Sequence, residues 1–347
     1  RLNRRAQMMG YAMVASSQGL FGLGTAFAFG ASALLFRDGT LTLGTVYLIF
    51  RYTDMLRQPT EQIRNEMQDF QQADASIGRI ESLFDEEPTI RDGTTAELPR
   101  GPLAVDLEHV SFGYSSERLI LDDIDVHVAP GRVLGIVGRT GSGKTTLTRL
   151  LPRFHDPQAG AVRLAGVDIR DVQLHALRSR IGLVTQDIHL FDATLRHNLT
   201  LFDDSISDDR LLDVIAAVGL GDWLRELPNG LDSMLGSDAS GLSAGQAQIL
   251  TCARVLLREP DLVILDEASS RLDPATERLL HNALGTLLSG RTGIIVAHRL
   301  VTFSYADDML VLEDGRVKEH GSRIELEADS NSHYAQLLRV AAEEVSA

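Results

Sequence analysis

Residues 138–145 read Gly138-Arg139-Thr140-Gly141-Ser142-Gly143-Lys144-Thr145, and this stretch decides the fold. A glycine, four residues and then Gly-Lys-Thr is the pattern typical of a phosphate-binding loop. The apolar run 133–137 predicts a buried strand before the loop, and residues 145–151 predict a helix after it. The alternative is a glycine-rich turn that merely contains a lysine, and the strand–loop–helix context argues against it. We therefore expect an α/β domain with a nucleoside triphosphate site.

The residue types in this loop suit a phosphate ligand. The glycines let backbone N–H groups point inward at phosphate oxygens. Lys144, one of only two lysines in the chain, can reach the β- and γ-phosphates with its flexible ammonium. The Thr145 hydroxyl can bind Mg²⁺. The predicted ATP-binding residues here are Gly138, Thr140, Gly141, Ser142, Gly143, Lys144, Thr145 and Thr146.

Composition narrows the function classes. The 33 basic and 48 acidic residues give a net charge of −15, so we expect no nucleic-acid partner. The one cysteine, Cys252, excludes an internal disulfide and a multi-cysteine metal site. The bias toward arginine over lysine suggests a GC-rich bacterial genome. The sequence begins with Arg1 rather than Met, and we expect a fragment or a processed product.

The first part of the chain has the pattern of a membrane protein. Residues 6–36 contain no charge, and a helix of that length would measure roughly 45 Å, longer than a hydrocarbon core of about 30 Å. Residues 39–50 are also uncharged and predict a second helix that leaves the bilayer from about Leu43. Arginines flank both outer ends of this hairpin, which predicts cytoplasmic ends. A hydrophobic hairpin buried in a soluble protein is the alternative.

Three regions follow from these patterns. Residues 1–84 are predicted to hold the last two membrane helices and an amphipathic stalk helix over 61–84. Residues 85–102 are rich in Pro, Gly and acidic residues and predict a linker. Residues 103–347 are predicted to form the nucleotide-binding domain, with a helical subdomain at about 190–258.

A second motif lies at residues 261–267, an apolar strand that ends in two carboxylates. Asp266 at the strand end suits Mg²⁺ beside the phosphate loop. Glu267 can orient or deprotonate an attacking water. An apolar strand that ends in solvent-facing acids is common, so the pairing with the phosphate loop carries this assignment.

The run Leu242-Ser243-Ala244-Gly245-Gln246 resembles the Leu-Ser-Gly-Gly-Gln signature of the ATP-binding cassette family. The resemblance covers residues 103 to about 340, with the family's motifs in the family's order. It implies that Tyr114 stacks on adenine, Gln186 contacts Mg²⁺ and the membrane domain, Asp273 belongs to the D-loop, and the switch residue His298 contacts the γ-phosphate. Ser243, Ala244, Gly245 and Gln246 would contact the ATP of a partner. Taken singly, Tyr114 could be a core aromatic, Gln186 and His298 ordinary polar strand ends, and Ser243 a plain helix N-cap.

The hairpin ahead of the cassette makes the chain similar to exporter half-transporters, in which six membrane helices precede each cassette. The resemblance implies an ATPase in the cell membrane, multi-pass, with a cytoplasmic nucleotide-binding domain. Two cassettes would close head to tail on ATP and Mg²⁺, with Glu267, His298 and Gln186 as the catalytic residues. The cargo is left open among drugs, lipids and peptides, and membrane lipids are expected partners. A soluble cassette protein without transport and a regulatory subunit with little hydrolysis are the rival hypotheses.

The sequence departs from the family pattern on the signature side. Ala244 stands where glycine is usual, Ala247 where arginine is common, Ser237 where exporters have glutamate, and Arg271 replaces a small residue. The phosphate loop, Glu267 and His298 agree with the pattern. Because heterodimeric exporters show such a split, we expect a heterodimer with a second half-transporter that carries the better signature.

Overall fold

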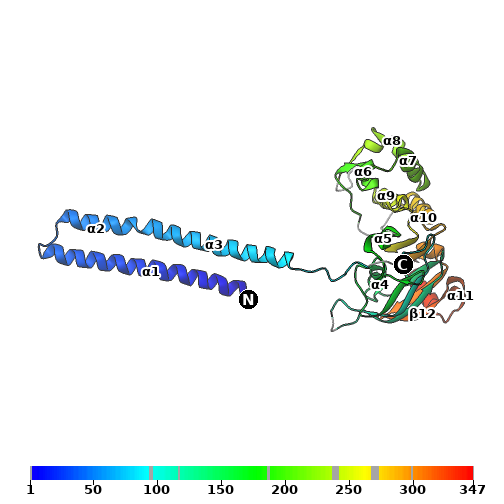
Figure 1. Ribbon diagram of the computed structural model, residues 1–347, viewed down its shortest axis with the longest axis horizontal. Coiled ribbons are helices and arrows are strands. Elements are labelled where there is room, and N and C mark those ends of the chain that lie inside the picture. Colours follow the sequence, from blue (N-terminus) through cyan, green and yellow to red (C-terminus); the bar gives the residue numbers. More distant parts are fainter. Residues whose placement is uncertain are drawn as a thin grey trace. The chain divides into compact units, whose positions relative to one another are not determined.

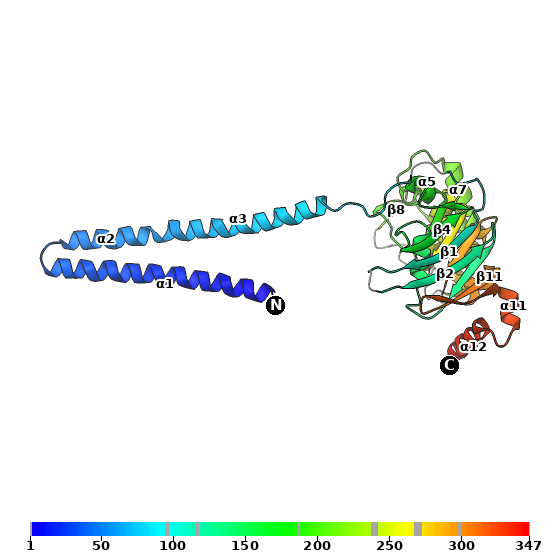
Figure 2. The ribbon, with the colours of Figure 1, turned by 60° about the horizontal axis from the view of Figure 1, so that its bottom comes forward.

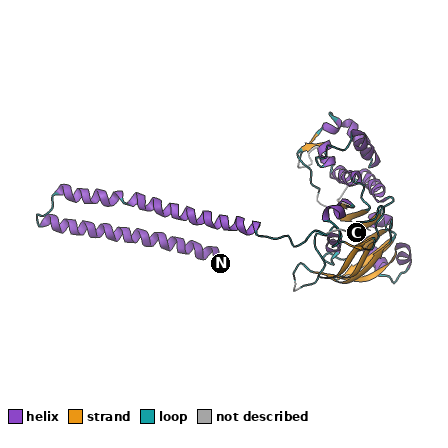
Figure 3. Ribbon diagram, in the orientation of Figure 1, coloured by secondary structure: helices purple, strands orange, loops and turns teal. Residues whose placement is uncertain are grey.

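The computed structural model of the chain describes residues 2–93, 97–115, 118–185, 188–236, 242–266, 273–297 and 300–346 (Figure 1). The chain divides into two compact units, Arg1–Thr89 and Ile90–Ala347, and each is described by itself. The first is entirely helical, and the second combines sheets and helices (Figure 3).

The first unit is a helical hairpin. Helix α1 (Leu2–Arg37) runs antiparallel to α2 (Leu43–Met55) and α3 (Arg57–Phe84) (Figure 1). The rings of Phe29 on α1 and Phe50 on α2 lie 5.3 Å apart between centroids, which holds the two arms together. Thr42 caps α2 by accepting a hydrogen bond from the Thr45 N–H at 3.3 Å.

The second arm has a break that the sequence did not suggest. α2 ends at Met55, Leu56 keeps helical backbone angles, and α3 starts at Arg57. Pro59 lies in the first turn of α3, where its missing N–H leaves the Met55 carbonyl without its intrahelical donor. The expected continuous helix from Leu43 is therefore divided at Leu56.

Among the described residues, one helical segment is long and apolar enough to cross a membrane, Gln18–Arg37 within α1. Helix α2 has only 13 residues and is followed by charged ones. The second predicted span is therefore shorter than a hydrocarbon core requires.

The second unit contains two main sheets. The larger has the order β12-β11-β3-β10-β9-β6, in which β12 is antiparallel and the other five strands are parallel. The smaller is antiparallel, with the order β2-β1-β4-β5, and β7 pairs with β8 separately. The strands are β1 (Val105–Phe112), β2 (Leu121–Val128), β3 (Val133–Val137), β4 (Ala159–Leu164), β5 (Val167–Asp168), β6 (Ile181–Val184), β7 (Ala193–Thr194), β8 (Met234–Leu235), β9 (Leu262–Asp266), β10 (Thr292–Val296), β11 (Asp308–Glu313) and β12 (Arg316–Ser322).

Helices surround these sheets, and α6, α7 and α8 gather at one end of the unit (Figures 1 and 2). The described helices are α4 (Lys144–Leu150), α5 (Leu174–Ser179), α6 (Leu195–Thr200), α7 (Asp208–Ala217), α8 (Gly221–Glu226), α9 (Ala244–Leu257), α10 (Pro274–Leu288), α11 (Arg323–Ala328) and α12 (His333–Ser346), with 3₁₀ turns η1 (Gly230–Asp232) and η2 (Leu300–Tyr305).

The larger sheet separates two hydrophobic cores. Because side chains alternate along a strand, Leu262 and Ile264 of β9 face the core shared with the smaller sheet and α4. Val263 and Leu265 face the core shared with α9 and α10. Burial on both faces explains why the parallel strands are continuous apolar runs. Cys252 lies fully buried in the second core, and burial raises the pKa of its thiol to about 12.

The order of the parallel strands determines where a site can form. Strands β3, β10, β9 and β6 are neighbours, so their carboxyl ends meet at one edge of the sheet. In open parallel sheets, ligands bind in the crevice outside these carboxyl ends. The loop 138–143 leaves the sheet at this edge.

Candidate nucleotide-binding site

The phosphate-binding loop depends on its glycines. Gly138 has φ +154° and Gly143 has φ +105°, values that L side chains rarely adopt. A Cβ atom at Gly138 would also lie 2.1 Å from the carbonyl oxygen of Leu312 on β11. The loop can therefore take this path only with glycine at these positions, and its backbone N–H groups stay accessible to a ligand.

Lys144 begins helix α4 and folds back over the loop. Its Nζ atom donates to the carbonyl oxygens of Gly138 at 2.8 Å and Arg139 at 3.0 Å. Only 6% of Lys144 is exposed. The ammonium is thus held within the curve of the loop, where a phosphate chain would be cradled.

Ser142 provides a test of fit for a phosphate. The residue is 4% exposed, and its Oγ atom has no hydrogen-bond partner among the described residues. A buried hydroxyl without a partner costs free energy unless a ligand satisfies it. Phosphate oxygens are suitable acceptors, so the loop fits the predicted ligand. Thr140, also predicted to bind ATP, lies exposed in the same loop.

The two predicted metal ligands with described positions lie together. The Oγ1 atom of Thr145 donates to Oδ1 of Asp266 at 3.4 Å. Asp266 closes β9, two strands from β3 in the sheet. A hydroxyl and a carboxylate at this spacing match the oxygen ligands that Mg²⁺ prefers.

Tyr114, the residue predicted to stack on adenine, lies among aromatic rings. Its ring meets the rings of Phe112 and His155 edge-on, with centroids 5.2 and 5.3 Å away. Its hydroxyl lies 3.4 Å from Oγ1 of Thr146, which follows the phosphate loop. Tyr114 remains 52% exposed, so a face of the ring is accessible to a base.

Three predicted catalytic residues, Gln186, Glu267 and His298, lie outside the described residues, as do Ser237 and Arg271. The described strands that precede the catalytic three are β6, β9 and β10. These strands are adjacent and parallel, with Val184 beside Leu265 and Asp266 beside Val296.

The signature residues begin helix α9. Ser243 caps the helix: its Oγ accepts from the Gln246 N–H at 3.1 Å, and its own N–H donates to Oε1 of Gln246 at 2.8 Å. This is a complete capping box. Ser243 and Ala244 are exposed and Gly245 is buried. The helix start with its N–H groups therefore faces outward, as an anion site on a partner-facing surface requires.

Asp273 caps α10 in the same manner. Its Oδ1 accepts from the N–H groups of Ala275 at 3.0 Å and Thr276 at 3.1 Å. The hydrogen bonds from Thr276 lower the pKa of this carboxyl. The predicted D-loop residue thus has a structural role at the start of α10.

Sequence reasoning missed a half-buried arginine on the signature helix. Arg254 donates to the carbonyl oxygens of Asn198 at 2.6 Å and His189 at 2.7 Å, and to Oδ1 of Asn198 at 2.8 Å. Burial lowers the pKa of the guanidinium. The side chain thereby joins α9 to α6 and to the segment that follows β6. The available signal for this role in the sequence was a charged residue within the apolar run 244–257.

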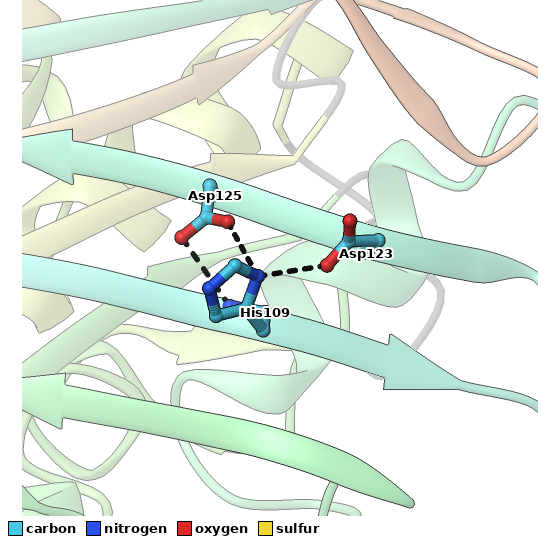
Figure 4. A group of neighbouring side chains, drawn as sticks. All are labelled: His109, Asp123 and Asp125. Carbon is cyan, nitrogen blue, oxygen red and sulfur yellow. Dashed lines mark hydrogen bonds and ion pairs between the residues drawn. The ribbon is translucent and has the colours of Figure 1, made fainter.

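A separate group of potential metal ligands lies on the smaller sheet (Figure 4). Nδ1 of His109, in an irregular part of β1, lies 2.9 Å from carboxylate oxygens of both Asp123 and Asp125 on β2. The hydrogen bond to Asp123, and then the charge of Asp125, raise the pKa of His109. The two carboxylates thus favour the protonated imidazole, whereas a metal ion would need the ring neutral.

Fold and loop together define the class, a P-loop nucleotide-binding domain that follows a helical hairpin in the sequence. Residues 121–270 match the family model described as ABC transporter. The chain belongs to the ABC transporter family, as its motifs predicted, and the nucleotide that this domain binds is ATP.

Particular relatives are bacterial exporters. The chain is 34% identical over 98% of its length to an ATP-dependent lipid A-core flippase of Pectobacterium atrosepticum, and 36% identical over 91% to that of Photorhabdus laumondii. It covers 60% and 55% of those proteins. A bacterial Atm1-family ABC exporter with ATP bound matches 93% of the chain at 31% identity with a TM-score of 0.71, and the chain covers 56% of it. The predicted fold class and the predicted resemblance to ABC exporter half-transporters are confirmed.

The relatives correct one prediction. Lipid A-core flippases act as homodimers, so the expectation of a heterodimer is wrong. That expectation rested on the signature departures. The capping box of Ser243 and Gln246 is complete, and the Ala244 methyl points to solvent. The substitution of glycine by Ala244 leaves the start of α9 intact, so it demands no partner with a different signature.

Proposed function

We propose that this chain is the ATP-hydrolysing half of an ABC exporter that works as a pair of identical subunits in the cell membrane. The observation that carries the proposal is the convergence of Lys144, the unpartnered buried Ser142 hydroxyl and the Thr145–Asp266 pair at the carboxyl edge of the parallel sheet. The family match supports ATP as the substrate of this site.

The site residues would divide the work as follows. The loop N–H groups and Lys144 bind and orient the phosphates, and Tyr114 stacks against the base. Thr145 and Asp266 would hold Mg²⁺, which neutralises phosphate charge when bound. Ser243 and the first N–H groups of α9 would complete the site of the other subunit. Glu267 would take a proton from water, His298 would fix the γ-phosphate, and Gln186 would connect the site to the membrane helices.

We keep a multi-pass membrane location as part of the proposal, with α1 holding the one candidate span among the described residues, and we propose an amphiphilic cargo. A groove of about 770 Å³ along the first unit is lined by apolar residues of α1, among them Phe21 and Phe29, and has a polar end with Asp54, Arg57, Glu61 and Arg64. Arg57 is paired with Glu61 at 3.2 Å, so the groove suits a molecule with an apolar body and a polar head group. The name of the flippase relatives favours a lipid.

The test is ATP turnover by the whole chain in lipid nanodiscs. We expect Glu267→Gln to abolish hydrolysis while ATP binding, followed with a fluorescent nucleotide, persists. Lys144→Ala should weaken both. Binding without turnover in the unaltered chain would contradict the proposal and favour a regulatory cassette. Stimulation of turnover by lipid amphiphiles over water-soluble peptides would support the cargo class.

A further inference from the structure

The segment after the predicted switch histidine is attached to the rest of the domain at two points. This segment, η2, begins two residues after His298. Phe303 packs over Gly135 of β3, where an added Cβ would lie 2.8 Å from its ring. Tyr305 packs over Gly285 of α10, where an added Cβ would lie 2.9 Å from its hydroxyl. Each aromatic ring therefore lies where only a glycine leaves room.

Tyr305 also forms polar contacts with α10. Its hydroxyl donates to the carbonyl oxygen of His281 at 2.7 Å and lies 2.6 Å from Nδ1 of the same residue. Since the hydroxyl hydrogen goes to the carbonyl, Nδ1 carries the hydrogen in the second contact. Nε2 of His281 then accepts from the Ser304 hydroxyl at 3.1 Å. This tautomer satisfies all three contacts.

Both attachments lead to elements of the nucleotide site. Helix α10 starts at Pro274, directly after its cap, the D-loop residue Asp273, and continues past His281 and Gly285. Directly after η2, Asp307 is bonded to Val133 at the start of β3: its N–H donates to the Val133 carbonyl and its Oδ2 accepts from the Val133 N–H, both at 2.8 Å. Strand β3 leads into the phosphate loop. The segment that follows His298 is therefore held between the D-loop helix and the phosphate-loop strand.

We propose that Tyr305 is a positioning residue, which through His281 lets the D-loop helix set the place of the switch segment during ATP hydrolysis. The inference rests on the proposed ATPase function. The helix transmits displacement at Asp273 because it is continuous, and the Tyr305 contacts carry that displacement to η2. Tyr305 itself touches no nucleotide.

Tyr305→Phe isolates the hydroxyl, because the ring stays over Gly285. We expect turnover per site to fall about 5- to 20-fold, within the usual range of coupling between sites, with the KM for ATP and the melting temperature nearly unchanged. His281→Ala should act alike, and the double variant should be no slower than the slower single variant. Tyr334→Phe, the same change at a buried tyrosine of α12, is the matched control and should leave turnover unchanged.

Two further arms make the outcome decisive. Amide hydrogen exchange in 302–306 should rise in Asp273→Ala, and it should rise no further when Tyr305→Phe is added. Hydrogen exchange reports the coupling between Asp273 and residues 302–306 even in a chain that does not hydrolyse ATP. Turnover of Tyr305→Phe within twofold of the unaltered chain, or additive exchange effects, would overturn the proposal. Turnover of Lys144→Ala is measured in parallel. If Lys144→Ala loses activity while Tyr305→Phe does not, the role of Tyr305 is wrong but the ATPase function stands.

Discussion

The Nζ atom of Lys144 lies 2.8 Å from the carbonyl oxygen of Gly138, the first residue of the loop that the lysine serves. Together with the contact to Arg139, this fixes a long flexible side chain in a site that is almost closed to solvent. The ammonium is compact enough for this place. A guanidinium is larger and planar, and its N–H donors have a fixed forked geometry.

Lys144→Arg tests this fit. Although arginine keeps the charge, we expect it to push against the loop carbonyls and to reduce turnover by about 100-fold or more, as the loss of a fixed transition-state donor does. Steady-state ATP hydrolysis measures the effect. Lys318→Arg, on exposed β12, is the control. Full activity of Lys144→Arg would mean that the site needs only a positive charge.

Tyr114→Ala should raise the KM for ATP roughly 5- to 150-fold, because stacking of a base on an aromatic ring contributes about 1–3 kcal/mol. The maximal rate should change little, since the ring lies away from the phosphates. Tyr114→Phe keeps the ring and should bind normally. Equal losses in both variants would instead assign the effect to the hydroxyl near Thr146.

Arg254→Ala should destabilise the domain by about 1–3 kcal/mol, because the partly buried carbonyl oxygen of Asn198 loses its charged donor and the link from α9 to His189 is lost. Trp223, the sole tryptophan, lies on α8 against the same core and reports urea unfolding by fluorescence. Arg258→Ala, at the exposed end of the same helix, should shift stability by less than about 0.5 kcal/mol. Similar midpoints for the two variants would contradict this account.

The pKa of His109 should lie above its usual value, and Asp123→Asn should lower it more than Asp125→Asn does. Because the folded-state pKa is raised, the ion pair stabilises the fold below the unfolded pKa, and this contribution disappears as pH rises through the folded pKa. The stability difference between the unaltered chain and Asp123→Asn should therefore be larger at pH 6 than at pH 9. NMR titration of the imidazole measures the pKa. If added zinc lowered the pKa of His109, the three residues would form a metal site and the ion-pair interpretation would be wrong.

Local patterns predicted the phosphate loop well, because its glycines and lysine act within eight consecutive residues. Asp266 followed from the end of an apolar run. Long-range contacts were beyond reach: Arg254 meets Asn198 across 56 positions, and His155 meets the Tyr114 ring without any local signal. The heterodimer prediction failed because four departures, Ser237, Ala244, Ala247 and Arg271, were taken together as a weak signature side, whereas the capping box at Ser243 is complete. The break at Leu56 between α2 and α3 was not predicted, although Pro59, inside an otherwise helical pattern, is a local signal for it.

The burial of Cys252 has a practical consequence for measuring motion. Its thiol lies on the core side of α9 and is held protonated at neutral pH, so thiol-reactive probes will not modify the folded protein there. A pair of cysteines engineered on the exposed faces of α3 and α7 would be the only reactive sites, without removal of the native residue. Spin labels or fluorophores placed there would report distances between the two units through each turnover, against a silent background.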